Sequence, residues 1–453
     1  MAMKSYFYKM STLLVVLCGS LVWANDTANM SEGEYLARAG DCMACHTDDA
    51  SKPYAGGHGL VSPIGTIYAT NITPDKTYGI GNYTYENFEQ ALRHGEKPSG
   101  DPLYPAMPFV SYAKMSDADV RALYEYFMNE VQPIAEPNLP TDIEWPLNMR
   151  FPMSIWIALL TDSREYIPQP DQSDEWNRGA YLVQGLGHCG ACHTPRSVTL
   201  VEQGLDETSE TFLSGAQFGG WYAPNLRTLR ENDDQELFRL LKEGRNTQHV
   251  FAGPMSDVTT HSLSHLTDED IHSMIVYLRS IQLPSERVNA IVANSDKHSE
   301  GYGLYQEYCS ACHGIQGEGV QNVAPLLANR GNGEQGRTLN VAQVILSGTE
   351  SVHNADRIAY QMPAYKDKFN NEEIAQLTNF IMHNSDWQNY NDKITAEDIQ
   401  KLKEGDPPMK GWPVIIYFID FIGILIVVGL FWSYQRSKKA KKIKKTKRQK
   451  VRK

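Results

Sequence analysis

The sequence lacks the short motifs that mark the commoner catalytic folds. We find no Rossmann dinucleotide-binding unit, no P-loop and no hydrolase nucleophile elbow. These absences exclude a nucleotide-binding or hydrolase site of the usual kinds. We therefore see no substrate-oxidising site in the chain itself.

Cysteine is scarce as well, with seven among 453 residues, and six of the seven fall in three copies of Cys-x-x-Cys-His. Each copy predicts a haem c attachment site, because two thiols three positions apart can add to the two vinyl groups of one haem. The adjoining imidazole can then bind the iron. The predicted haem-attaching residues are Cys42, Cys45, Cys189, Cys192, Cys309 and Cys312, and the predicted iron ligands beside them are His46, His193 and His313.

A single Cys-x-x-Cys is also typical of a zinc half-site, a thiol redox pair or a disulfide. A zinc site needs a second pair of ligands, and a thioredoxin-like pair needs a βαβ setting. In this chain a histidine directly follows the second cysteine in every copy. Three covalently bound haem c groups, which contain iron, are therefore the favoured cofactors.

The N-terminus predicts a secretory signal peptide over residues 1–24. Lys4 and Lys9 precede the apolar stretch Leu13–Trp23, and Ala24 supplies the small residue of a cleavage site. The seventh cysteine, Cys18, lies inside this segment and follows Leu17 rather than a small residue, so a lipoprotein signal is the weaker alternative. After cleavage no free thiol remains. Export also suits haem c, which bacteria attach on the outer side of the cytoplasmic membrane.

Charge is nearly absent from residues 412–434, where Asp420 is the one charged residue. A helix of this length spans about 34 Å, against about 30 Å of bilayer hydrocarbon, so we predict one transmembrane helix. A carboxylate in such a helix costs about 2.5 to 3.5 kcal/mol. Asp420 can therefore be interpreted in two ways: it handles protons at a quinone site, or it is a protonated or paired acid without that role.

Acidic residues are absent from the tail, 435–453, which carries twelve Lys or Arg. By the positive-inside rule this basic tail is cytoplasmic, and the haem region faces the periplasm of a bacterial inner membrane. A basic tail is also typical of nucleic-acid binding. Beside a membrane helix, however, anionic lipid headgroups are the expected partners and nucleic acid is not.

Basic residues are few in the predicted periplasmic part. Of 42 Lys and Arg, 12 lie in the tail and 2 in the signal, leaving 28 against 53 Asp and Glu when Asp420 is set aside. The resulting net charge near −25 favours partners with basic patches, although solubility alone explains it equally well.

The three motifs occupy matching places in three units of about 100 residues, the size of a small domain. Each unit has Gly-x-x-Leu before the motif, where we expect the glycine to admit a second helix closely. Each later has a helical pattern that ends at a C-capping glycine. A final helix begins at a capping residue and carries an aromatic residue on its apolar stripe. The glycines before the motifs are Gly33, Gly179 and Gly301, and the C-capping glycines are Gly95, Gly244 and Gly348. The capping residues of the final helices are Ser116, Thr267 and, more loosely, Asn371, and their aromatic residues are Tyr126, Tyr277 and Phe380.

A methionine beside a proline follows the second helix of each unit. These residues, Met107, Met255 and Met362, lie 61, 62 and 49 residues after the motif histidines. A thioether is a suitable second axial ligand for haem iron, and an adjoining proline stiffens the loop. For a lone methionine core packing is the usual interpretation, but the threefold placement favours ligation.

We therefore predict a mainly α-helical fold with three tandem cytochrome c domains and one C-terminal transmembrane helix. A short apolar run within the linker, Met153–Leu160, is too short to span a membrane and predicts either a packed helix or a partner-docking surface. The predicted segments are a signal peptide at 1–24, cytochrome c domain 1 at 25–140, a linker at 141–172, domain 2 at 173–285, domain 3 at 286–387, a polar tether at 388–411, the transmembrane helix at 412–434 and the tail at 435–453.

With these residues in view, the chain resembles the three-haem cytochrome c subunit of membrane-bound bacterial sugar and alcohol dehydrogenases, of the gluconate, alcohol, sorbitol and fructose dehydrogenase type. The resemblance covers nearly all of the chain and is strongest in Gly65–Asp75, Ala91–Gly95 and Leu103–Pro108. It implies a catalytic partner subunit with a flavin or quinone cofactor. It also implies that electrons pass through the haems to ubiquinone in the inner membrane. In the second unit the proline precedes Met255 rather than following it, which weakens the match there.

Two other functions use the same residues. An anchored periplasmic cytochrome c could deliver electrons to a terminal oxidase without any dehydrogenase. A haem peroxidase would need an iron with an open distal position, whereas all three units offer a methionine.

Overall fold

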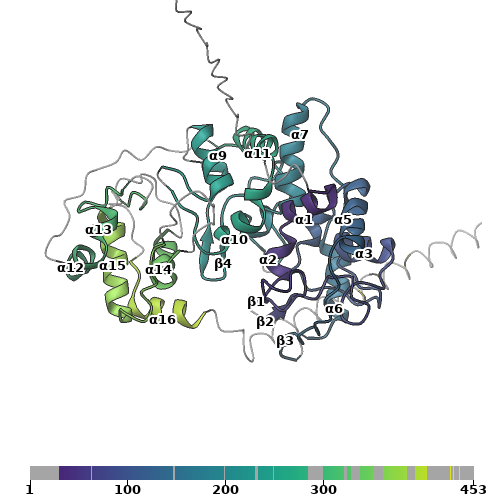
Figure 1. Cartoon of the computed structure of the whole chain (residues 1–453), viewed down its shortest axis with the longest axis horizontal. Coiled ribbons are helices and arrows are strands. Elements are labelled where there is room, and N and C mark those ends of the chain that lie inside the picture. Colours follow the sequence, from purple (N-terminus) through teal and green to yellow (C-terminus); the bar gives the residue numbers. More distant parts are fainter. Residues whose placement is uncertain are drawn as a thin grey trace, which may run out of the picture.

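The structure is a computed structural model that places three helical repeats along the chain (Figure 1). It describes residues 30–62, 64–145, 148–197, 199–229, 233–247, 249–283, 299–320, 324–327, 337–349, 361–384 and 393–405, with residues 429, 432 and 438. The predicted signal peptide 1–24 and nearly all of the predicted membrane helix 412–434 and basic tail 435–453 lie outside these residues. Among the described residues, no helix has the length and apolar character needed to cross a membrane.

The first repeat surrounds the first Cys-x-x-Cys-His motif with helices and a small sheet. Its elements are α1 (Glu32–Ala39), α2 (Cys42–His46), β1 (Gly59–Ser62), β2 (Gly65–Tyr68), α3 (Tyr85–His94), α4 (Phe109–Tyr112), α5 (Asp117–Asn129) and β3 (Asp142–Ile143). The strands pair antiparallel in the order β1-β2-β3, with Gly65 opposite both Ser62 and Ile143.

The second repeat follows the same order with a separate hairpin. Its elements are α7 (Asp174–Tyr181), the π-helical turn η2 (Leu182–Leu186), α8 (Gly190–His193), β4 (Ala216–Phe218), β5 (Trp221–Ala223), the 3-10 turn η3 (Leu226–Thr228), α9 (Asp234–Glu243), α10 (Pro254–His261), the 3-10 turn η4 (Leu263–His265) and α11 (Asp268–Ser280). Strands β4 and β5 pair antiparallel, with Gln217 opposite Tyr222.

The third repeat is helical in its described residues. Its elements are α12 (Glu300–Tyr308), α13 (Ser310–His313), α14 (Arg337–Ser347), α15 (Asn371–Asn384) and α16 (Ala396–Glu404). Part of the segment predicted as a tether, 388–411, forms α16, which lies against α15 and buries Ile399 completely. The core of this repeat therefore extends beyond residue 387.

The first and last long helices of every repeat pack closely through one glycine, as predicted. Helix α1 lies against α5, α7 against α11 and α12 against α15. A Cβ atom on Gly33, Gly179 or Gly301 would collide with a backbone carbonyl oxygen of the partner helix and approach the Cβ of Tyr126, Tyr277 or Phe380. The sequence pattern thus predicted both the glycine and the residue that it contacts.

The helix ends follow the predicted capping residues, with one correction. Gly95 and Gly244 end α3 and α9 in the left-handed conformation, and Gly348 after α14 also has a positive φ of 73°. The Ser116 and Thr267 side chains accept from the backbone N–H groups at the starts of α5 and α11.

In the third repeat the predicted cap at Asn371 is wrong by one residue. Asn370 Oδ1 accepts from the Glu373 N–H at 2.9 Å, while the Glu373 carboxylate accepts from the Asn370 N–H at 2.8 Å. These reciprocal hydrogen bonds place the cap just before the helix.

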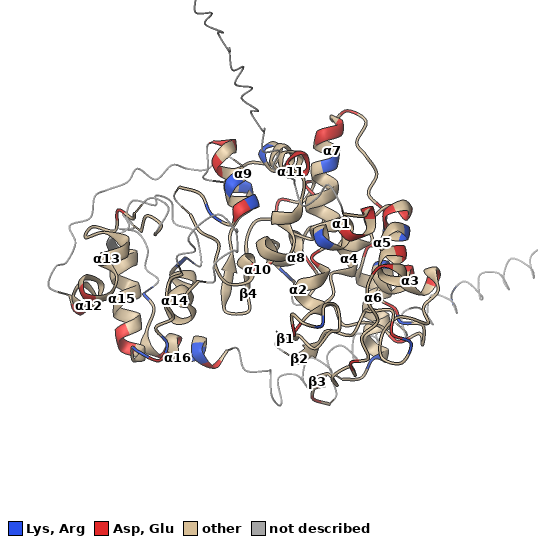
Figure 2. Ribbon diagram, viewed as in Figure 1, with Lys and Arg blue, Asp and Glu red and all other residues tan. Residues whose placement is uncertain are grey.

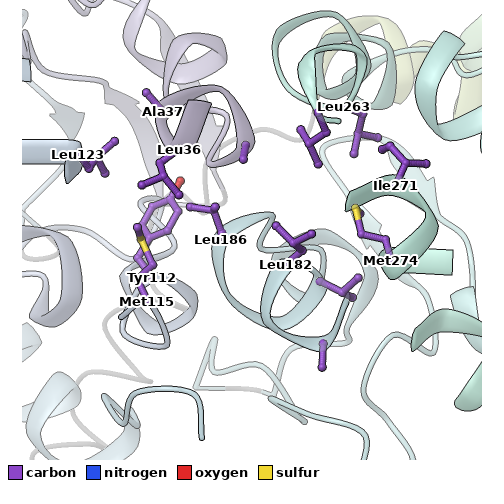
Figure 3. Packing of buried hydrophobic residues seen from close by; sticks show 14 of the residues in the cluster. Leu36, Ala37, Tyr112, Met115, Leu123, Leu182, Leu186, Leu263, Ile271 and Met274 are labelled. Atoms are coloured by element: carbon purple, nitrogen blue, oxygen red, sulfur yellow. The ribbon is translucent and has the colours of Figure 1, made fainter. Parts of the chain in front are cut away.

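The first two repeats share one hydrophobic core, whereas the third has its own. In Figure 3, Leu182 and Leu186 of η2 lie between Leu36 of the first repeat and Met274 of the second. All four side chains are at most 3% exposed. The first two motifs are therefore held in a single packed unit.

The apolar run of the linker forms a surface helix. Helix α6 (Phe151–Leu160) has no buried residue, and Phe151 and Leu159 are 75% and 70% exposed. The Trp156 indole N–H donates to the Thr199 carbonyl at 2.7 Å, which fastens the helix to the second repeat. The predicted helix is confirmed, but the packed position favoured for it is wrong, because much of its apolar surface is uncovered within the described residues.

Acidic side chains gather at the starts of several helices (Figure 2). The first turns of α5, α7 and α11 each contain at least two Asp or Glu residues. Negative charge at this position is stabilised by the unpaired N–H groups and the positive end of the helix dipole. Part of the acidic excess therefore also supports the fold.

Candidate haem sites

Each Cys-x-x-Cys-His motif lies at a short helix that follows the first helix of its repeat, with the turn η2 between them in the second repeat. The motif helices are α2, α8 and α13. All six motif cysteines are free thiols, so the disulfide interpretation is not supported. Among the described residues, no three His, Cys, Asp or Glu side chains lie close enough together to hold a metal ion.

The three motif histidines have the same hydrogen bond. Nδ1 of His46 contacts the carbonyl oxygen of Thr70 at 2.6 Å, Nδ1 of His193 that of Pro224 at 2.7 Å, and Nδ1 of His313 that of Pro325 at 3.1 Å. A carbonyl oxygen can only accept, so Nδ1 carries the proton in all three rings. This tautomer leaves the Nε2 lone pair for an iron ion.

Burial keeps two of these imidazoles neutral. It lowers the pKa of His46 and of His193, and the hydrogen bonds to Thr70 and Pro224 oppose this effect only in part. His193 and His313 are each 8% exposed. A neutral, oriented and sheltered imidazole fits the proximal position of a haem.

Burial differs among the motif thiols: Cys309 is buried, the four of the first two motifs are partly buried, and Cys312 is exposed. Burial raises the pKa of Cys42 and Cys189 to about 12 and that of Cys309 to about 11, with a smaller contribution from the second cysteine of the same motif. These three thiols are therefore uncharged at neutral pH.

The first two motifs lie close to each other. Burial raises the pKa of Cys45 to about 12, with smaller electrostatic contributions from the neighbouring Asp41, Cys192 and Asp257. Helix α10, which carries Met255 of the second repeat, also lies against α2 of the first. Residues 147 positions apart in the chain thus border one region.

The predicted methionine ligands border the same cores as the motifs. Met107 and Met255 pack against the shared core, as Cys42 and Cys189 also do. Met362 packs against the separate core of the third repeat, which includes Cys309. All three side chains are partly buried. Ligation by these sulfur atoms stays a prediction from the sequence.

Backbone conformation positions the methionine loops. Gly253 has a φ of 57° and precedes α10, in which Pro254 is the first residue. In the third repeat, Met362 and Thr349 are joined by two hydrogen bonds, from the Thr349 N–H to the Met362 carbonyl at 3.0 Å and from the Met362 N–H to Thr349 Oγ1 at 3.1 Å. The two hydrogen bonds fasten Met362 close to the end of α14.

The carbonyl partners of the histidines were missed by the sequence analysis. They can nevertheless be recognised in the sequence, because each carbonyl belongs to the second residue of a short segment that recurs in all three repeats. The segments are Ala69–Ile72, Ala223–Leu226 and Ala324–Leu327. Their distances from the motifs, 24, 31 and 12 residues, differ too much for a fixed spacing to reveal them.

Two family models match the chain. One is described as "Cytochrome C oxidase, cbb3-type, subunit III" and matches residues 28–127, and the other is described as "Cytochrome c" and matches residues 298–385. The prediction of cytochrome c domains is confirmed for these two ranges, and with it covalently bound haem c. Neither range includes the second motif.

Several proteins are similar over most of the chain. The gluconate 2-dehydrogenase cytochrome c subunit of Pantoea cypripedii is 40% identical over 424 residues, covering 88% of this chain and 96% of that protein. The cytochrome c subunit of the quinone alcohol dehydrogenase of Komagataeibacter europaeus is 39% identical, covering 85% and 87%. The fructose dehydrogenase cytochrome subunit of Gluconobacter japonicus is 33% identical, covering 94% and 97%.

Proposed function

Because this chain belongs to the family of cytochrome c subunits of gluconate, alcohol and fructose dehydrogenases, we propose that it carries electrons away from a catalytic dehydrogenase subunit. In this proposal it does so with three covalently bound haem c groups. The electrons come from a sugar or an alcohol oxidised by the partner, which carries a flavin or quinone cofactor. They leave to ubiquinone in the membrane.

The threefold histidine geometry carries this proposal. In each repeat a motif histidine donates from Nδ1 to a backbone carbonyl, which assigns Nε2 to the iron, and the two cysteines of the motif precede it in the chain. The second motif, which no family match covers, has the same arrangement as the other two, so we assign a haem to it as well. A bound haem supplies a one-electron iron couple.

The chain's own residues have three tasks in this function. The cysteines would fix each haem, and the histidines would bind its iron. Met107, Met255 and Met362 would each supply a second ligand and so leave no open position for small substrates. The shared core then keeps the first two haems close, as the proximity of Cys45 and Cys192 supports.

Membrane attachment is part of the same proposal. We assign residues 412–434 to one transmembrane helix and the basic tail to the cytoplasm, which puts the haems in the periplasm beside the quinone pool. The predicted signal peptide supports this location, because haem c is attached outside the cytoplasmic membrane. Asp420 then lies at the depth of the quinone.

Delivery of electrons to a terminal oxidase is the second candidate. It is favoured by the first family match, whose description names an oxidase subunit. The two functions use the same haems and differ in the partner. A search for the partner therefore distinguishes them directly.

The test is isolation of the native complex in mild detergent, followed by mass spectrometry of its subunits and of the haem-bearing peptides. We expect a catalytic dehydrogenase subunit to co-purify, haem on all three motifs, and reduction of the haems by one class of sugar or alcohol. Recovery of oxidase subunits, with no reduction by any sugar or alcohol, would contradict the dehydrogenase role.

A further inference from the structure

The hairpin β4–β5 holds the second motif histidine from both of its ends. At its start, the Gly215 N–H donates to the His193 carbonyl oxygen at 2.8 Å. At its end, the Pro224 carbonyl accepts from Nδ1 of His193 at 2.7 Å. The orientation of this imidazole therefore depends on where the two ends of the hairpin lie.

The outer part of the same hairpin is bound to the third repeat. Strand β5 lies against α14. Asn340 of α14 makes two hydrogen bonds with Tyr222: its Oδ1 accepts from the Tyr222 N–H at 2.8 Å, and its Nδ2 donates to the Tyr222 carbonyl at 2.8 Å. Gln343, which is 8% exposed, donates to the Gly220 carbonyl at 3.1 Å. In Figure 1 the hairpin correspondingly lies between α14 and the rest of the second repeat.

The hairpin also contacts the predicted distal side. The Trp221 ring lies directly on Gly253, where a Cβ atom would collide with three ring carbons. Gly253 stands two residues before Met255. One strand of three residues thus contacts the methionine loop, the third repeat and, through Pro224, the histidine.

We propose that Asn340 is a positioning residue for the second haem, because it couples the docking of the third repeat to the axial ligands of that haem through β4–β5. This inference rests on the proposed haem at the second motif. Asn340 touches none of the predicted ligands and acts through the backbone of Tyr222. Through the same contact, the hairpin connects the second motif with the third repeat.

The direction of the effect follows from the histidine bond. A firm Nδ1–H to carbonyl bond makes the imidazole a more basic ligand and stabilises oxidised iron. Loss of the Asn340 contacts frees the outer hairpin and loosens the Pro224 carbonyl. The midpoint potential of the second haem should then rise, while that of the first stays constant.

The test compares Asn340→Ala with Asn379→Ala in the complete holoprotein. Asn379 makes the same reciprocal pair, with the backbone of Ile394 at 2.9 and 3.0 Å, but inside the third repeat. We expect Asn340→Ala to raise the second potential and to speed hydrogen exchange of the Tyr222 amide about fivefold, the equivalent of one hydrogen bond of about 1 kcal/mol. Asn379→Ala should change neither, and Gln343→Ala serves as a second variant if Asn340→Ala accumulates poorly.

Two outcomes overturn the coupling. One is that the midpoint potential of the second haem is unchanged in both Asn340→Ala and Gln343→Ala. The other is that Asn379→Ala shifts this potential as much as Asn340→Ala does. The second haem is identified as the one whose potential changes in Met255→Leu. Absence of haem from Cys189 and Cys192 in the unaltered protein would instead contradict the proposed function, and peptide masses detect it separately.

Discussion

Single polar residues connect the first two repeats. Asp270, which is 6% exposed, accepts from the Arg178 guanidinium at 2.8 and 2.6 Å and from the Tyr35 hydroxyl at 2.6 Å. Tyr35 comes from α1, Arg178 from α7 and Asp270 from α11. One carboxylate therefore fastens helices of both repeats, and its removal leaves a guanidinium and a hydroxyl without their acceptor.

Asp270→Asn should lower the free energy of unfolding by about 3 kcal/mol, the lower end for a broken buried ion pair because Arg178 remains partly exposed. Denaturant titration followed by circular dichroism measures the change. Asp234→Asn is the matched control, since Asp234 is 61% exposed and pairs with Arg279 on the surface. A loss below about 1 kcal/mol, the usual value for surface pairs, would show that the Asp270 network is not structural.

Tyr35 should make stability fall at high pH. Burial, and then the hydrogen bond to Asp270, raises the pKa of Tyr35 to about 12 from 10.0. Between these values the unfolded chain loses the proton and the folded chain keeps it, so stability is complete below pH 10 and declines as the pH rises toward 12. Tyr35→Phe should reduce this slope by up to about 1.4 kcal/mol per pH unit, measured by denaturant titration from pH 9 to 12. Parallel profiles of the two proteins would refute the assignment.

The three predicted methionine ligands need a direct test. Met107→Leu, Met255→Leu and Met362→Leu each conserve volume, so a change in the haem spectrum reports ligation rather than packing. We expect each to convert one haem from six to five ligands, seen in the visible spectrum of the oxidised protein. Met115→Leu, at a fully buried core methionine, should leave the spectrum unchanged. A substitution at a predicted ligand that behaves like Met115→Leu would remove that residue from the ligand set.

Among the elements, the helix pair of each repeat depends on its glycine. Helix α12 contains both a tightly packed glycine, Gly301, and an open one, Gly303, around which a Cβ atom would meet nothing within 4 Å. Gly301→Ala should destabilise the third repeat by about 1 to 3 kcal/mol through overpacking. Gly303→Ala should stabilise it by up to about 1 kcal/mol, because alanine favours a helix. Equal effects of the two substitutions, measured by denaturation, would contradict the close packing of α12 on α15.

Sequence patterns predicted those elements whose signals are local. The capping residues, the C-terminal glycines and the close-packed glycines act within one helix or one helix pair, and their threefold repetition made them visible. The cap of α15 was misplaced because Asn370 and Asn371 are adjacent and both are suitable residues.

Features that depend on tertiary packing were not predicted. The carbonyl partners of the histidines are backbone atoms, and a carbonyl places little constraint on its residue type, as Thr70 and Pro224 show. The surface position of α6 also could not be read from its composition, because an apolar helix is ordinarily buried. In both cases the deciding contacts come from residues distant in the chain.

At the scale of the whole molecule, the three repeats are not equivalent. The first two motifs border one core and lie close to each other. The third borders a separate core and meets the second repeat through α14 and the hairpin. In the proposed function, this arrangement would give one haem pair within a shared core and a third haem in a repeat that is joined to the second by the hydrogen bonds of Asn340 and Gln343.

The two cores predict two unfolding transitions in differential scanning calorimetry of the holoprotein. Asp270 lies in the shared unit of the first two repeats and Gly301 in the third. Asp270→Asn should therefore lower only one melting temperature and Gly301→Ala only the other, each by several degrees. The hydrogen bonds of Asn340 and Gln343 are too few to fuse the two transitions, because each adds only about 1 kcal/mol. A single transition that both substitutions shift alike would show instead that the three repeats unfold as one cooperative unit.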